Sequence, residues 1–136
     1  MNKEIFGTDL FIKSNLGINQ IKQVISKHFD IEDGLIFNEN EFGYEKYNQH
    51  IGDDNLCVIH ELSKEGDFSY KIDLELIKKP NINEITGITS NQEIIIAVSN
   101  DFLDMKQSES YQIIADGHIL KQIEIIQYND DTYRIA

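Results

Sequence analysis

A strict alternation of apolar and polar residues between positions 68 and 76 constrains the fold of this chain more than any other feature of its sequence. Every second residue is apolar, in the order Phe68, Tyr70, Ile72, Leu74 and Leu76. The residues between them are polar: Ser69, Lys71, Asp73 and Glu75. Successive side chains of a β-strand point to opposite faces of a sheet, so this segment predicts a strand with one buried and one solvent-exposed face.

The preceding residues, 55–62, predict the partner strand of a β-hairpin. The sequence SKEGD separates the two segments and suits a short connecting turn. Closing the hairpin over this turn pairs three apolar couples: Leu62 with Phe68, Val58 with Ile72, and Leu56 with Leu74. The same register places His60 on the buried face opposite Tyr70, which makes this couple a candidate for a buried hydrogen bond.

One amphipathic helix is predicted at residues 18–29 (INQIKQVISKHF). Its apolar residues recur at helical spacing: Ile18, Ile21, Ile25 and Phe29. Polar residues occupy the opposite side, as in a helix that packs one face on a core. Ser14 and Asn15 precede it and offer a helix cap. Residues 4–13 (EIFGTDLFIK) predict a strand before the helix.

The last third of the sequence predicts more strands. Residues 92–99 (QEIIIAVS) form a short apolar run that suits a central strand, and residues 111–115 and 118–128 flank Asp116-Gly117, a dipeptide typical of a type I′ hairpin turn. A further turn near Asp130-Asp131 pairs two couples: Tyr128 with Tyr133, and Ile126 with Ile135. We therefore expect a single α+β domain spanning residues 1–136, with a mainly antiparallel sheet built from sequential hairpins and one helix packed on it.

The charge of the chain excludes some classes of partner and favours another. Twenty-four acidic residues face twelve basic ones, which gives a net charge of −12, and Arg134 is the only arginine. Proteins that bind nucleic acid or anionic membranes need a basic surface, so both classes are disfavoured. A strongly acidic surface maintains solubility, and it also steers basic partners into contact.

Several features predict a cytoplasmic protein. The first residues lack the apolar run and cleavage site of a signal peptide, and no apolar stretch approaches the length of a membrane span. Cys57 is the only cysteine, so no disulfide within the chain is possible. Because it lies in a predicted strand between apolar residues, we expect a reduced structural thiol.

No motif for catalysis or for binding a metal or cofactor is present. The four histidines, at positions 28, 50, 60 and 118, are not spaced from one another or from Cys57 as metal ligands are. Acidic pairs are common, but Asp73 and Glu75 are expected on the solvent side of their strand. The sequence contains no HExxH, GxSxG or glycine-rich phosphate-binding pattern. We therefore predict a non-enzymatic protein with no catalytic residue, no metal and no cofactor.

Two irregular segments, 38–54 and 98–110, combine aromatic and apolar side chains with many carboxylates. Tyrosine provides rigid contact area at a small entropic cost, and acidic residues add steering, so both segments fit a surface that recognises a basic partner. The candidate contact residues are Glu39, Glu41, Phe42, Tyr44, Glu45, Tyr47, Asp53, Asp54, Asp101, Phe102 and Asp104. The alternative is structural: the aromatic residues tuck under the sheet and anchor the loops.

A small, acidic α+β chain with stretches such as NENEFGYEKY and SNDFLDMK resembles the immunity proteins of bacterial toxin–immunity systems, including those of contact-dependent growth inhibition. The resemblance covers the whole chain as a type and rests on no diagnostic motif. It implies tight binding to one cognate toxin, often a basic nuclease, by covering its active site or a neighbouring surface.

Three hypotheses of function follow. The first is a non-enzymatic inhibitor that neutralises a basic toxin domain. The second is a structural or adaptor domain that associates through a sheet edge, which would self-associate independently of ionic strength. The third is an enzyme with acidic catalytic residues, which requires a concave pocket where several carboxylates converge. The sequence does not indicate the oligomeric state.

Overall fold

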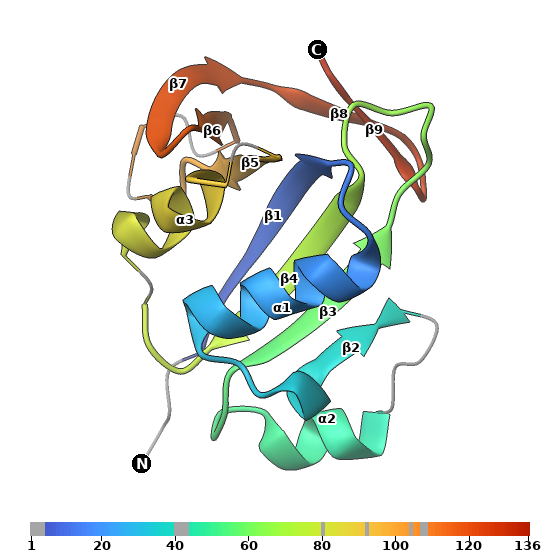
Figure 1. The fold of residues 1–136 in the computed structure, drawn as a ribbon, viewed down its shortest axis with the longest axis vertical. Helices are drawn as coiled ribbons and strands as arrows, with labels where there is room; N and C mark the ends of the chain where they lie inside the picture. The colour runs from blue at the N-terminus through green and yellow to red at the C-terminus, as the bar shows by residue number, and fades with distance from the viewer. Residues whose placement is uncertain (1–4, 40–43, 80, 92, 104, 107–108) are drawn as a thin grey trace.

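A seven-stranded sheet forms the centre of the computed structural model, which describes residues 5–39, 44–79, 81–91, 93–103, 105–106 and 109–136 (Figure 1). The strand order is β2-β3-β4-β1-β5-β6-β7. These strands are β1 (Phe6–Ser14), β2 (Ile36–Asn38), β3 (Leu56–Glu61), β4 (Tyr70–Leu76), β5 (Ile94–Ser99), β6 (Tyr111–Ala115) and β7 (His118–Ile123). A separate two-stranded sheet consists of β8 (Ile125–Asn129) and β9 (Thr132–Ile135).

The chain is α+β with a mostly antiparallel sheet, as the sequence predicts. Only the β2–β3 pair of the large sheet is parallel among the pairings that the structure describes. The described residues form three α-helices, whereas the sequence predicts one: α1 (Ile18–Phe29), α2 (Tyr44–His50) and α3 (Ile82–Thr89). A short 3-10 helix, η1 (Asp33–Leu35), leads into β2. None of these helices has both the length and the apolar character needed to cross a bilayer.

Helices α1 and α3 lie on one face of the sheet, here called the helical face (Figure 1). Helix α1 has the predicted bounds, and Ile21, Ile25 and Phe29 are buried beneath it. Its N-cap is Gly17 rather than Ser14 or Asn15, and the Gln20 side chain accepts a hydrogen bond from the Gly17 N–H at 3.3 Å. Because α1 buries a full apolar stripe, the helical face carries the main hydrophobic core.

The pairing of β3 with β4 differs by one residue from the predicted register. Ile59 lies opposite Ile72 and Cys57 opposite Leu74, so these four residues face the helices. His60 therefore lies on the other face, opposite Lys71 instead of Tyr70. The prediction failed because both alternating sets of β3 contain apolar residues. The register that forms keeps an ionisable imidazole out of the core, where a charged group is costly.

The other face of the sheet, here called the open face, is covered at one end by the β8–β9 hairpin. Tyr133 of β9 packs on Phe11 of β1 with ring centres 4.9 Å apart, and Phe68 joins them in a second apolar cluster. The β3–β4 turn is held to β9 because the Asp67 N–H donates to the Tyr133 carbonyl at 2.9 Å. Gly66 allows this approach, since a Cβ there would lie 2.7 Å from the same carbonyl oxygen.

The C-terminal hairpins form as predicted, with two differences. Asp116 and Gly117 both have positive φ, at 51° and 78°, as a type I′ turn requires. The predicted strand 118–128 is divided at Glu124, so that β7 belongs to the large sheet and β8 to the small one. The β8–β9 register is also shifted by one residue, and Ile125 instead of Ile126 lies opposite Ile135.

Candidate functional site

An acidic cleft of about 760 Å³ lies on the open face of the sheet, beyond the part that the β8–β9 hairpin covers. Its floor is formed by β1, β3 and β4, and its walls by α2 and the residues that follow β5. The lining residues are Gly7, Thr8, Asp9, Tyr47, Val58, Lys71, Asp73, Glu75, Ser99, Asp101 and Tyr111. Tyr47 comes from the first acidic segment predicted from the sequence and Asp101 from the second, so the fold brings both segments to one site.

The charged residues of this lining are mostly acidic. Four carboxylates, from Asp9, Asp73, Glu75 and Asp101, share the described lining with one ammonium group, that of Lys71, which lies within 4 Å of Asp9 and Asp73. Residues at alternate positions of one strand share a face, which places Lys71, Asp73 and Glu75 of β4 together in the cleft. The alternation that predicted the buried face of β4 thus also specifies the polar floor of the site.

Asp9 and Asp73 form a carboxyl pair at the centre of the floor. They lie directly opposite each other in the β1–β4 ladder, and the Lys71 ammonium group lies within 4 Å of both. Burial, followed by hydrogen bonding to Asp73 and its negative charge, raises the pKa of Asp9 to about 6. The pKa of Asp73 is lowered, because hydrogen bonds with Asp9 and His60 and the charge of Lys71 outweigh the effect of burial. The two carboxyl groups are therefore unequal, and Asp9 is the one that keeps its proton to the higher pH.

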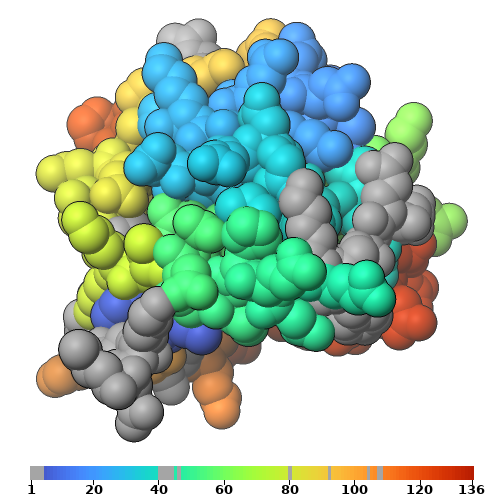
Figure 2. Space-filling model, turned by 90° about the horizontal axis from the view of Figure 1, so that it is seen from below, coloured from blue at the N-terminus to red at the C-terminus, as the bar shows by residue number. Residues whose placement is uncertain are grey.

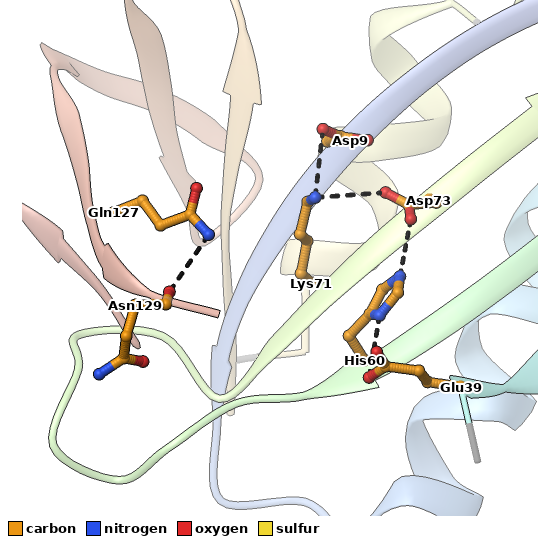
Figure 3. A network of polar contacts seen from close by, with 7 residues as sticks. All are labelled: Asp9, Glu39, His60, Lys71, Asp73, Gln127 and Asn129. Atoms are coloured by element: carbon orange, nitrogen blue, oxygen red, sulfur yellow. Dashed lines mark hydrogen bonds and ion pairs between the residues drawn. The ribbon is translucent and has the colours of Figure 1, made fainter. Parts of the chain in front are cut away.

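His60 and Lys71 connect this pair to the rest of the site (Figure 3). His60 Nε2 lies 2.7 Å from Asp73 Oδ2, and its Nδ1 lies 3.1 Å from Glu39 Oε2. Lys71 Nζ lies 3.7 Å from Asp9 Oδ2 and 3.8 Å from Asp73 Oδ1. The candidate hydrogen bond between His60 and Tyr70 is not the one that forms. The Tyr70 hydroxyl instead donates to the Leu16 carbonyl at 2.7 Å.

Tyr47 of α2 forms the wall nearest to β3. Its ring packs edge-on against Phe37, with centres 6.0 Å apart, and its hydroxyl is hydrogen-bonded to Glu75. Burial, followed by this hydrogen bond, raises the pKa of Tyr47. One carboxylate oxygen of Glu75 is buried and has no hydrogen-bond partner among the described residues. The α2 surface itself, green in Figure 2, occupies the centre of the lower face of the molecule.

The predicted contact residues are divided between the cleft, its surroundings and the core. Tyr47 and Asp101 line the cleft, and Glu39 binds His60 at its border. Phe102 packs against the main core, as the structural alternative for these loops expected.

The remaining candidates lie elsewhere or are not described. Glu45 and Asp53 are exposed, and Asp54 is paired with His50 at 2.7 Å. Those outside the described residues are Glu41, Phe42, the side chain of Tyr44, and Asp104.

The residues that the sequence did not predict for the site are Asp9, His60, Lys71, Asp73 and Glu75. Four of them belong to β3 and β4, and the alternation of β4 could have indicated Lys71, Asp73 and Glu75. Asp9 could not have been found this way, because only the pairing of β1 with β4 brings it to Asp73.

The arrangement is suited to holding a cation and to exchanging a proton. Among the residues that the structure describes, no three histidine, cysteine or acidic side chains are grouped as metal ligands. Cys57 is fully buried, and this burial raises the pKa of its thiol, as expected for a structural cysteine. An ammonium or guanidinium group satisfies converging carboxylates without metal geometry.

A larger cleft, of about 900 Å³, lies beside the start of α1 and the β3–β4 turn. Its charged residues are mixed in sign: Lys13, Lys64, Glu61, Asp67 and Glu93. No titratable side chains are joined there into a network like that of Figure 3 in the described part of the chain. The acidic cleft is therefore the better candidate, although it is the smaller of the two.

Comparisons with known proteins identify no relative: no family model, no characterised protein and no solved structure matches this chain at a significant level.

Proposed function

We propose that this chain is a non-enzymatic binding protein that neutralises a basic toxin domain, and that its acidic cleft receives a lysine or arginine side chain of that domain. The observation that supports this most directly is the convergence of four carboxylates in one cleft whose walls come from both acidic segments. Such a cleft offers a cationic side chain charge-assisted hydrogen bonds in a partly desolvated place. The net charge of −12 would steer a basic domain towards it.

The geometry around Lys71 supports the choice of a cationic side chain. An ammonium group of the chain itself already lies within 4 Å of both Asp9 and Asp73. Tyr47 and Tyr111 stand at the sides of the cleft and present aromatic surface, which favours cations. A second ammonium or guanidinium group from a partner would leave the described lining nearer to neutrality, since its carboxylates outnumber its cations by four to one.

A nuclease is the class of toxin that this chemistry fits best. A nuclease must attract phosphate and therefore carries a basic active-site surface, which an acidic protein can cover in competition with the substrate. The resemblance to bacterial immunity proteins is one of type and agrees with this choice.

The test is calorimetric binding to a panel of basic nuclease domains. We expect at least one domain to bind with an affinity that falls as salt rises, and its nuclease activity to be inhibited. Asp73→Asn should weaken binding about tenfold or more, because it removes a central charge of the cleft. Asp116→Asn removes the same charge at a distant turn where asparagine tolerates the positive φ, and should change affinity less than about twofold. Equal effects of both variants, or no binding, would contradict the proposal.

A second candidate, an acid–base enzyme, is favoured by one observation. Asp9 and Asp73 combine a raised and a lowered pKa within a cleft, which is how a carboxylic acid and a carboxylate share catalytic roles. Turnover of peptide or glycoside substrates by the free chain, abolished in both Asp9→Asn and Asp73→Asn, would establish this candidate over the first. We place the binding protein first because the net charge of −12 and the two acidic segments in the walls of the cleft favour a basic partner.

A further inference from the structure

The Asp9–Asp73 pair holds a proton for a geometric reason. Two carboxylates held at directly opposite positions of a sheet repel each other when both are ionised, which favours keeping a proton on one of them. Their Cα atoms are partners in the β1–β4 ladder, and neither strand can shift without breaking the register of the sheet. The two carboxyl groups are therefore held together by the fold, and a second ionisation must place two negative charges side by side.

The surroundings of the pair do not neutralise a second negative charge. The titratable and charged groups that face it are Lys71 and Glu75 from β4, His60 from β3, Glu39 after β2, Tyr47 from α2, Asp101 after β5, Tyr111 from β6 and Tyr133 from β9. Among these described groups, Lys71, and His60 when it is protonated, are cationic. A cation that enters from outside would stabilise the doubly ionised pair further and so favour it at lower pH.

We propose that binding in the acidic cleft is linked to a proton: when a cationic side chain of the partner enters, the Asp9–Asp73 pair releases the proton that it holds in the free chain. This inference rests on the proposed function, because it needs a cationic group in the cleft. The balance is one cationic group bound and one proton transferred from the carboxyl O–H to water or buffer, with no other bond changed. Affinity for the partner then rises with pH until the pair is ionised in the free chain as well.

The direction and size of the effect follow from linkage. Asp9 titrates at about pH 6 in the free chain, so below that pH the partner must displace a proton in order to bind. Each unit of pH below this value lowers affinity by up to about tenfold, and above about pH 7 the dependence disappears.

The free chain tests the proton itself. NMR of the side-chain carboxyl carbons, recorded from about pH 3 to about pH 8, should show one carboxyl of the pair titrating near pH 6. Histidine side chains contribute no carboxyl signals to this measurement. In Asp9→Asn the Asp73 signal should titrate only at acidic pH, whereas Asp116→Asn should retain the wild-type curve. Complete ionisation of both carboxyls below about pH 5 in the wild-type chain would overturn the inference.

Binding tests the linkage. A hexa-arginine peptide serves as the cationic probe, its position is confirmed by amide shifts of Tyr47 and Asp101, and calorimetry in buffers of different ionisation enthalpy counts the protons released. At pH 6 we expect release of about half a proton per site, rising towards one below about pH 5, retained in Asp116→Asn and lost in Asp9→Asn. Binding in the cleft without proton release overturns the linkage and leaves the proposed function standing. Failure of both the peptide and the nuclease panel to bind overturns both, even if the carboxyl titration is as expected.

Discussion

The Asp9–Asp73 pair should make the free energy of unfolding depend on pH, whether or not a partner is bound. The pKa of Asp9 is higher in the folded chain than in the unfolded one, so the folded state binds this proton more tightly. The free energy of unfolding that Asp9 contributes is therefore largest at acidic pH and falls as pH rises from about 4 to about 6. The opposite holds for Asp73, whose lowered pKa adds stability that is lost only in strong acid.

Asp9→Asn should therefore raise the stability of the chain at pH 7. Asparagine can still donate a hydrogen bond to Asp73, but it removes one of two adjacent negative charges. The Asp9 side chain is 47% exposed, so solvent screening reduces the gain to about 1 kcal/mol. Urea unfolding at pH 7 and at pH 4.5 measures this difference, which should shrink at the lower pH. A variant that is destabilised at pH 7 would show that the charge of Asp9 is fully compensated by Lys71.

Tyr47 is expected to contribute more to partner binding than any single carboxylate of the acidic segments. Aromatic anchors commonly dominate an interface, by about 2 kcal/mol or more, whereas charges at the rim mainly change the association rate. Tyr44 carries the same expectation, although its side chain lies outside the described residues. Calorimetry of Tyr47→Ala, Tyr44→Ala and Asp101→Asn against the bound nuclease would rank them.

The position of Tyr47 requires a control for folding. Its hydroxyl binds Glu75 and its ring packs on Phe37, so truncation to alanine also removes contacts within the chain. Tyr47→Phe keeps the ring and loses only the hydrogen bond, which should cost about 1 kcal/mol of stability. If Asp101→Asn weakens binding more than Tyr47→Ala does, the expected division between aromatic anchors and steering charges is wrong.

Among the elements, the helical face could be predicted from the sequence far better than the open face. The sequence predicts helix α1 at its observed bounds because its apolar residues recur at helical spacing and all lie on one face. The buried residues of that face are Ile21, Ile25 and Phe29. Helices α2 and α3 were missed because they have seven and eight residues and short patterns that do not separate helix from loop. Asn81, whose side chain accepts from the Glu84 N–H at 3.1 Å, was the available signal for α3.

Strand registers were predicted with the correct partners but with shifts of one residue. Apolar alternation specifies which residues share a face, whereas the residue directly opposite is decided by turn geometry and by the whole sheet. In the register that β3 adopts, His60 contacts Asp73 on the open face. This contact joins two different strands, so the local sequence around either residue does not reveal it. The candidate site was predicted in part for the same reason: its walls are local segments, but its floor exists only after β1 pairs with β4.

The close approach of the β3–β4 turn to β9 predicts that Gly66→Ala is strongly destabilising. An added Cβ would lie 2.7 Å from the Tyr133 carbonyl oxygen and 3.1 Å from its nitrogen, so the turn must move away from β9. We expect a cost of about 1–3 kcal/mol, as for other overpacked sites. Gly7→Ala is the matched control, because its Cβ would meet only the Leu74 carbonyl at 3.8 Å. Thermal unfolding of both variants tests this, and equal stability would show that the turn can adapt.

At the scale of the whole molecule, charge and sheet edges together predict a monomer. Edge strand β2 has three residues, and edge strand β7 carries a bulge opposite β6 and an exposed Lys121, all of which hinder pairing with another strand. A net charge of −12 adds repulsion between copies. Light scattering at about 0.05 M and about 0.5 M salt should give the mass of one chain in both conditions. A dimer that persists at high salt would support the adaptor hypothesis instead.

The division of the sheet into a helical face and an open face has a consequence for how this protein could diversify. The residues that stabilise the main core point towards α1 and α3, while the walls of the acidic cleft come from α2 and the residues after β5. Substitutions at exposed wall positions such as Asp101 can accumulate with little loss of stability, whereas Tyr47 and Phe102 also pack against the main core. A lineage could therefore be re-targeted to a new antagonist through the exposed positions while its scaffold is inherited unchanged. Engineers could use the same separation by randomising only the wall positions and selecting variants for altered specificity.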